Sequence, residues 1–156
     1  MYRRSGNTMY YIVLLAVYLS RNASLGMSGL ALDSVLVRDI MSKALITVNP
    51  LTTCFQIAKM MKNGFIGAVL VREKMNHVGI ITDRDFAIKI TTNRLSYDTH
   101  VGEIMSSPLI TINHDKSMLE AVKTMDAMNT RKLAVSQDGN IVGIITSTDI
   151  INQLAR

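Results

Sequence analysis

The sequence reads Val78-Gly-Ile-Ile-Thr-Asp-Arg-Asp85 and, 64 positions later, Val142-Gly-Ile-Ile-Thr-Ser-Thr-Asp149. In each copy a short β-branched apolar segment, typical of a buried strand, runs into Thr-x-x-Asp, a pattern typical of a helix start. Each copy therefore predicts a strand that passes directly into a helix. The first free N–H groups of that helix would lie beside a Thr hydroxyl and an Asp carboxylate, and such a corner can hold a sugar and a phosphate.

A capping box alone would also explain the Thr-x-x-Asp pattern, with Asp in place of the usual Glu. For one copy seen alone that simpler interpretation would be the better one, because a short motif is only a hypothesis. The motif occurs twice, each time after Val-Gly-Ile-Ile. Its repetition favours a functional corner in each copy.

The same offset relates most of the chain from Val37 onward. The segment Val37-Arg-Asp-Ile-Met41 aligns with Val101-Gly-Glu-Ile-Met105, and Ile46-Thr-Val48 aligns with Ile110-Thr-Ile112. Internal repetition at this length predicts two related supersecondary units packed on one another. We therefore expect an α/β (α+β) fold with the order strand, helix, strand, strand, helix in each repeat.

Two capping boxes, Thr53-x-x-Gln56 and Ser117-x-x-Glu120, precede runs with apolar residues three and four positions apart. Each predicts the start of an amphipathic helix. The first helix should end in a left-handed residue at Asn63-Gly64. Core positions predicted for the two helices are Ile57, Met60 and Met61 in the first and Ala121, Val122, Met125 and Met128 in the second. Methionines at helical spacing are typical of a core.

A β-hairpin should follow each of these helices. Its first strands are expected at 67–71 and 132–136, with turns at 73–76 and 138–140 before the Val-Gly-Ile-Ile-Thr strands. Helices should then cover 83–92 and 147–155. The domain boundaries that we predict are 1–34 for a non-repeat segment, 35–93 for the first repeat, 94–100 for a linker and 101–154 for the second repeat.

The composition is that of an ordinary folded domain. The 156 residues are 48% hydrophobic and 19% charged, and the formal net charge is +5. Arg3, Arg4 and Arg21 supply three of these charges, so the rest of the chain is nearly balanced. The basic stripe with interleaved aromatics that favours nucleic-acid binding is missing from the sequence, which also has no Trp.

The sequence gives little indication of catalytic or metal chemistry. A lone Cys54 within a helical pattern predicts a core residue in a reducing compartment, with no internal disulfide. His77, His100 and His114 lack the spacing of metal ligands. Because the pattern offers no nucleophile with a base and no acid–base carboxylate pair, we expect a protein that is not an enzyme.

The first 34 residues have no counterpart in the repeat and leave three alternatives. The apolar run Met9–Leu19 is shorter than the roughly 20 residues that span a bilayer. A basic start with a short apolar centre suits a signal peptide. Translation could instead begin at Met27, and we favour this alternative because a reduced Cys and a nucleotide-type corner suit the cytoplasm. The protein should then be stable without residues 1–26.

Taken together, these motifs resemble a tandem pair of cystathionine-β-synthase (CBS) domains, also called a Bateman module. The resemblance covers roughly Val35 to Leu154 and is specific, since several motifs match in order in both halves. It implies two β-α-β-β-α units packed about a pseudo-twofold axis, with two clefts that commonly bind adenosine-containing ligands such as AMP, ADP, ATP or S-adenosylmethionine. It also implies frequent dimerisation.

The resemblance implies roles for particular residues. The ribose-binding carboxylates fall on Asp85 and Asp149, beside the hydroxyls of Thr82 and Thr146. An ionised carboxylate can accept hydrogen bonds from two vicinal ribose hydroxyls at once. The family's base contacts come from the first strand and from the segment before the second strand, which places them here at Thr47, Ile66, Gly67, Thr111, Arg131 and Lys132.

In related modules each cleft takes its Asp from one repeat and its base or phosphate contacts from the other. The cleft of Asp85 would then combine Arg84 with Arg131 and Lys132, whereas Thr148 replaces Arg84 beside Asp149. A phosphorylated ligand should therefore prefer the Asp85 cleft.

The expected function is a regulatory, signal-transducing module that senses an adenosyl ligand, works in the cytoplasm as a homodimer and needs no cofactor. The alternatives are a ligand-free dimerisation scaffold and a DNA-associated or membrane-associated regulator that uses the basic segment before the repeat. The sequence does not identify the regulated protein.

Overall fold

The computed structural model describes residues 33–155, which form two compact units with the expected mixed α+β fold. One unit is Ala44–Ile110, and the other joins 33–43 to 111–155. The expectations for the first 32 residues lie outside the described part of the chain. Among the described helices, none has the length and apolarity that crossing a membrane requires.

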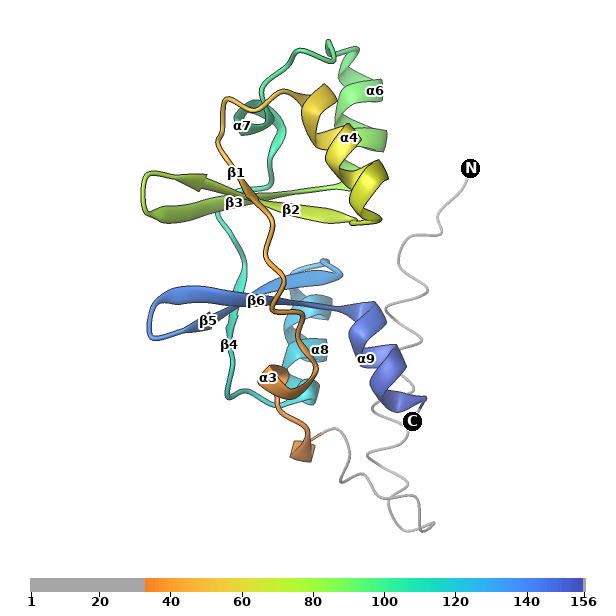
Figure 1. The fold of residues 1–156 in the computed structure, drawn as a ribbon. Helices are drawn as coiled ribbons and strands as arrows, with labels where there is room; N and C mark the ends of the chain where they lie inside the picture. The colour runs from red at the N-terminus through yellow and green to blue at the C-terminus, as the bar shows by residue number, and fades with distance from the viewer. Residues whose placement is uncertain (1–32, 156) are drawn as a thin grey trace. The chain divides into compact units, whose positions relative to one another are not determined.

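The unit Ala44–Ile110 contains a three-stranded sheet in the order β1-β2-β3. Strand β1 runs parallel to β2, and β2 pairs antiparallel with β3 as the predicted hairpin. Figure 1 shows helices α4, α6 and α7 on one face of this sheet. The elements are β1 (Thr47–Val48), α4 (Cys54–Gly64), β2 (Ala68–Glu73), β3 (Asn76–Thr82), α5 (Asp83–Asp85), the π-helical turn η2 (Phe86–Ile90), α6 (Thr91–Asn93) and α7 (Val101–Ile104).

The second unit repeats this plan with the sheet order β4-β5-β6 and the same parallel and antiparallel pairings. Both hairpins carry a register shift at the same place, between Val71 and Arg72 and between Val135 and Ser136. The elements are α3 (Val37–Ile40), β4 (Thr111–Asn113), α8 (Met118–Ala127), β5 (Lys132–Gln137), β6 (Asn140–Thr146) and α9 (Ser147–Leu154). The predicted order strand, helix, strand, strand, helix is confirmed in both repeats.

Each repeat also opens with a short helix that the sequence pattern did not predict, and the two repeats exchange these openings. Helix α7, at the start of the second repeat, belongs to the unit Ala44–Ile110, where the N–H of Val101 donates to the carbonyl of Thr52 at 2.9 Å. Helix α3, at the start of the first repeat, belongs to the other unit, where the N–H of Val37 donates to the carbonyl of Lys116 at 2.8 Å.

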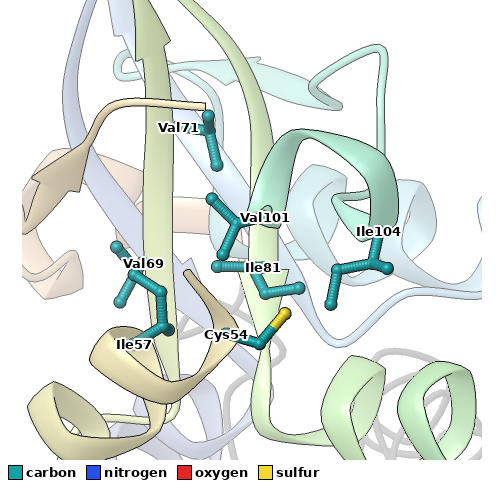
Figure 2. Packing of buried hydrophobic residues seen from close by; sticks show 7 residues of the cluster. All are labelled: Cys54, Ile57, Val69, Val71, Ile81, Val101 and Ile104. Carbon is teal, nitrogen blue, oxygen red and sulfur yellow. The ribbon is translucent and has the colours of Figure 1, made fainter. Parts of the chain in front are cut away.

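Apolar burial explains why α7 packs in this unit. Val101 and Ile104 join a cluster of fully or almost fully buried side chains supplied by α4, β2 and β3, as Figure 2 shows. The other members of the cluster are Cys54, Ile57, Val69, Val71 and Ile81. A buried aliphatic side chain contributes about 1.5–3 kcal/mol relative to an exposed one, so two such residues hold the short helix in place.

The two residues that follow each opening helix explain why the strand motif Val-Gly-Ile-Ile contains a glycine. A Cβ at Gly79 would lie 2.6 Å from Met105 Sδ and 2.9 Å from the Ser106 carbonyl oxygen. A Cβ at Gly143 would lie equally close to Met41 Sδ and to the Ser42 carbonyl oxygen. Only glycine lets the exchanged segment pass this close to the strand.

Three expectations about the helices need correction. Helix α4 ends at Gly64 as expected, but the left-handed residue is Phe65, with φ of 51°, and its N–H donates to the Met61 carbonyl. Met128 follows the last residue of α8 and is 56% exposed, so it is not a core residue. The helix expected over 83–92 is interrupted by the π-helical turn η2.

Cys54 is buried as predicted, and its burial, with a smaller contribution from Glu103, raises the pKa of its thiol.

Candidate functional site

The first strand-to-helix corner brings together four of the residues predicted to bind a ligand. Thr82 ends β3 and pairs across the hairpin with Ala68 at the start of β2. The N–H of Asp83 donates to the Gly67 carbonyl at 3.3 Å, which places Ile66 and Gly67 beside the start of α5. Asp85 lies in the same turn. These residues form one corner at one end of the sheet.

The second corner repeats this arrangement. Thr146 ends β6 and pairs with Lys132, and the N–H of Ser147 donates to the Arg131 carbonyl at 3.0 Å. Asp149 lies in the first turn of α9. Residues Arg131 and Lys132 thus stand at the second corner where Gly67 and Ala68 stand at the first.

The two predicted base-contact threonines lie one strand further away. Thr47 of β1 is opposite Leu70 of β2, and Thr111 of β4 is opposite Ala134 of β5. The Thr47 hydroxyl lies 3.4 Å from His77 Nε2. Burial, together with the charge of Arg72, lowers the pKa of His77, so a neutral imidazole is favoured there.

Both Asp side chains form the capping box that the simpler interpretation requires. In each corner the Thr N–H and the Thr hydroxyl donate to Oδ2 of the Asp at 2.8 and 2.7 Å, and the Asp N–H donates back to the Thr hydroxyl at 3.3 Å. The cap fixes the direction of each carboxylate and uses only one of its two oxygens. Capping therefore leaves Oδ1 available for another donor.

The two corners differ at this second oxygen. Oδ1 of Asp85 lies 2.8 Å from Lys89 Nζ and accepts from the Ser106 hydroxyl at 3.3 Å. Lys89 also donates to the Ile104 carbonyl at 2.6 Å, at the end of α7. Within 33–155 no hydrogen bond or ion pair is found for Oδ1 of Asp149, whose residue four positions on is Gln153.

Sequence reasoning missed Lys89, although a signal existed. Lys89 and Gln153 are separated by the same offset of 64 that relates the two Asp residues. An acid followed four residues later by a Lys forms an ion pair on one helical face, which an acid followed by Gln cannot do. Comparison of the two repeats at this position would have predicted unequal corners.

Partial burial makes the Asp85–Lys89 pair more than a surface contact. The Asp85 side chain is 11% exposed and that of Lys89 is 34% exposed. Burial by itself raises the pKa of the Asp85 carboxyl, but the hydrogen bonds from Lys89 and Thr82 outweigh it and hold this pKa below its ordinary value. Asp85 is therefore ionised and paired at neutral pH.

The cations predicted to clamp a phosphate are divided between the two units. Arg84 is exposed in Ala44–Ile110, whereas Arg131 is exposed and Lys132 half-buried in the other unit. Their convergence on one ligand stays a prediction. In the described part of the chain, His, Cys, Asp and Glu residues form no group of three or more that could hold a metal ion.

Comparison with known proteins agrees with this architecture. The family model for the CBS domain matches residues 37–91 and again 101–156. The uncharacterised protein MK0525 of Methanopyrus kandleri is 38% identical over 121 residues, covering 76% of this chain but only 62% of its own length. The CBS domain-containing protein YhcV of Bacillus subtilis is 33% identical over 120 residues, covering 76% of this chain and 86% of its own length.

A solved structure shows the same fold. The CBS domain pair of protein MJ0100, in complex with 5′-methylthioadenosine and S-adenosyl-L-methionine, superposes with a TM-score of 0.70 at 29% identity. The match covers 78% of this chain and 96% of that one. With two family matches that together span most of the sequence, the chain belongs to the CBS domain family and carries two CBS domains in tandem, the arrangement called a Bateman module.

Proposed function

We propose that this protein is a regulatory module without catalytic activity that binds an adenosine-containing ligand such as AMP, ADP, ATP or S-adenosylmethionine. Ligand binding would change its contacts with a regulated protein. One observation carries the proposal: each strand-to-helix corner holds an Asp carboxylate in a fixed direction through a Thr cap that occupies a single oxygen.

The chemistry of the corner suits a ribose. A carboxylate accepts hydrogen bonds only, and the 2′ and 3′ hydroxyls of ribose present two donors side by side. Hydrogen bonds to an ionised acceptor are stronger than neutral ones, each contributing about 1.5–3 kcal/mol. Since the cap already orients the carboxylate, little side-chain freedom would be lost when the sugar binds.

Relatedness supports the ligand class. The CBS pair of MJ0100, which shares the fold at 29% identity, is solved with two adenosine derivatives. Those two ligands share an adenosine moiety and differ in what is attached to its 5′ carbon. A receptor that reads the ribose diol would bind both, which is why we propose an adenosyl ligand rather than one particular nucleotide.

Calorimetric titration tests this function directly. Adenosine, AMP, ATP and S-adenosylmethionine should be titrated into the protein, together with 3′-deoxyadenosine, which lacks one hydroxyl of the diol. We expect at least one ribose ligand to bind, and 3′-deoxyadenosine to bind more weakly than adenosine by about 1.5–3 kcal/mol. Equal affinity for adenosine and 3′-deoxyadenosine would show that the carboxylates do not bind the ribose diol.

A matched variant separates ligand binding from helix capping. Replacing Asp149 with Asn keeps an acceptor oxygen for the Thr146 cap but removes the charge, so stability should change by less than about 1 kcal/mol while affinity falls. Lowered stability with unchanged affinity would mean that the motif serves only as a helix cap.

A ligand-free scaffold is the alternative. We propose a homodimer in either case, so light scattering during gel filtration should give twice the chain mass of 17.3 kDa. The scaffold predicts a dimer that none of these nucleosides or nucleotides binds at millimolar concentration. A monomer at high protein concentration would argue against the dimer in both proposals.

A further inference from the structure

We propose that the two corners are unequal ribose receptors: Asp149 is open to a ribose diol, whereas Lys89 closes Asp85 by occupying the oxygen that the diol would need. This inference rests on the proposed adenosyl binding and adds to it the residue that distinguishes the two sites. It makes Lys89 a specificity-determining residue, because it decides which corner binds first.

At the closed corner the acceptor capacity of the carboxylate is already used. Oδ2 of Asp85 accepts from the Thr82 N–H and hydroxyl, and Oδ1 is contacted by Lys89 Nζ at 2.8 Å and by the Ser106 hydroxyl at 3.3 Å. Two carboxylate oxygens offer about four lone-pair positions, so these four donors fill them. A diol can bind only after it displaces Lys89 or Ser106.

Lys89 is itself well satisfied in this position. Its ammonium has three N–H donors and three acceptors within reach: Asp85 Oδ1 at 2.8 Å, the Ile104 carbonyl at 2.6 Å and the Ser106 hydroxyl at 3.3 Å. With only 34% of the Lys89 side chain exposed, the pair is less screened by solvent than a surface pair. Displacing the ammonium therefore has a cost that ligand binding must overcome.

The open corner has the same Thr cap but lacks a lysine paired with the carboxylate. Thr146 holds Oδ2 of Asp149 at the same 2.8 and 2.7 Å, so the carboxylate points the same way relative to its helix. Gln153 replaces Lys89, and the structure from residue 33 to 155 places no donor on Oδ1. Toward the described residues Ser42, the counterpart of Ser106, makes only its two backbone hydrogen bonds with Ile144. A diol can therefore bind Asp149 without displacing a protein group.

Adenosine is the appropriate probe, because it carries the diol and has no phosphate. The preference of a phosphorylated ligand for the Asp85 cleft, expected from Arg84, Arg131 and Lys132, does not enter the measurement. Each corner is isolated by removing the other carboxylate: Asp149→Ala leaves the Asp85 corner and Asp85→Ala leaves the Asp149 corner.

Calorimetry with adenosine should show tighter binding to Asp85→Ala than to Asp149→Ala, by about tenfold for one charge-assisted contact that must be broken. Adding Lys89→Gln to Asp149→Ala should tighten binding by a similar factor, because the closed corner opens. Adding Gln153→Lys to Asp85→Ala should weaken adenosine binding, because the new lysine would pair with Asp149 and close the open corner.

Two further variants control for charge and folding. Lys62→Gln removes a positive charge from an exposed position on α4 and should leave adenosine binding by Asp149→Ala unchanged. Lys89→Arg keeps the charge and should keep the corner closed. If Lys89→Gln destabilises the unit Ala44–Ile110, the Gln153→Lys exchange still tests the inference in the other unit.

The outcomes distinguish this inference from the proposed function. Adenosine binding that is equal in Asp85→Ala and Asp149→Ala, or tighter in Asp149→Ala, overturns the inference and leaves the proposed function standing. Weaker binding after Lys89→Gln also overturns it, since Lys89 would then be a ligand contact. A wild-type protein that binds no adenosyl ligand overturns the proposed function, and the inference with it.

Discussion

Gly143→Ala should destabilise the protein, because the exchanged opening of the first repeat passes directly over this position. The new Cβ would lie 2.6 Å from Met41 Sδ, 2.9 Å from the Ser42 carbonyl oxygen and 3.2 Å from Met41 Cγ. The Met41 side chain can rotate away, but the Ser42 carbonyl is backbone that accepts a 2.9 Å hydrogen bond from the Ile144 N–H. Relief of the clash therefore requires the segment to move off the strand.

The expected magnitude follows from two opposing effects. Overpacking a tight site costs about 1–3 kcal/mol, whereas replacing glycine by alanine within a strand gains roughly 0.5–1 kcal/mol. The net loss should be about 1–2 kcal/mol, which lowers the melting temperature of a chain of this length by roughly 2–8 °C. Urea unfolding followed by circular dichroism measures the loss directly.

Gly64→Ala is the matched control. Gly64 ends α4, and a Cβ there would meet nothing closer than Ile66 Cγ1 at 3.6 Å, an ordinary contact. This variant should be neutral or slightly more stable. Adding Met41→Ala to Gly143→Ala should recover only part of the loss, because the Ser42 carbonyl remains. A Gly143→Ala protein as stable as wild type would refute the close approach of residues 41–42 to β6.

Further predictions concern the two corners. The pKa of Asp85 lies below its ordinary value, so the ion pair of Asp85 stabilises the fold at neutral pH. This contribution is lost as the pH falls through the lowered pKa. The free energy of unfolding, measured from about pH 7 to 3, should therefore fall less steeply in Asp85→Asn than in wild type. Thr146→Ala removes the cap of α9 and should cost about 1 kcal/mol in urea unfolding, whereas equal stability would mean that the cap contributes nothing. AMP should bind more tightly than adenosine by about 1–3 kcal/mol in calorimetry. The double variant Arg131→Ala, Lys132→Ala should bind AMP and adenosine equally. A double variant that still prefers AMP would exclude these two cations as the phosphate-binding residues.

The sequence predicted those parts of the fold that depend on neighbouring residues. The four capping boxes and both hairpins are confirmed, because each is determined by residues within a few positions of one another. The offset of 64 then related the two units. The corner geometry at Asp85 and Asp149 was predictable for the same reason, since the Thr cap is local.

Long-range packing accounts for what the sequence did not predict. The openings Val37–Ile40 and Val101–Ile104 have only four helical residues each, too few to show a period, and their location in the opposite unit depends on contacts across the chain. Helix α4 ends at Gly64 as expected, but Gly64 is still helical and the next residue, Phe65, takes the left-handed position. Met128 is exposed because α8 ends at Ala127, so the apolar spacing no longer turns this side chain inward.

The exchange of opening segments determines the order in which the two units can fold during synthesis. Once residue 110 has left the ribosome, every residue of Ala44–Ile110 is available, so this unit can fold while translation continues. Helix α3 is made earlier, yet its partners follow only after the 67 residues 44–110 have been added. The segment synthesised first among the described residues thus waits for those synthesised last, and a gene cut between the two repeats would encode two fragments that each lack a helix belonging to their own core.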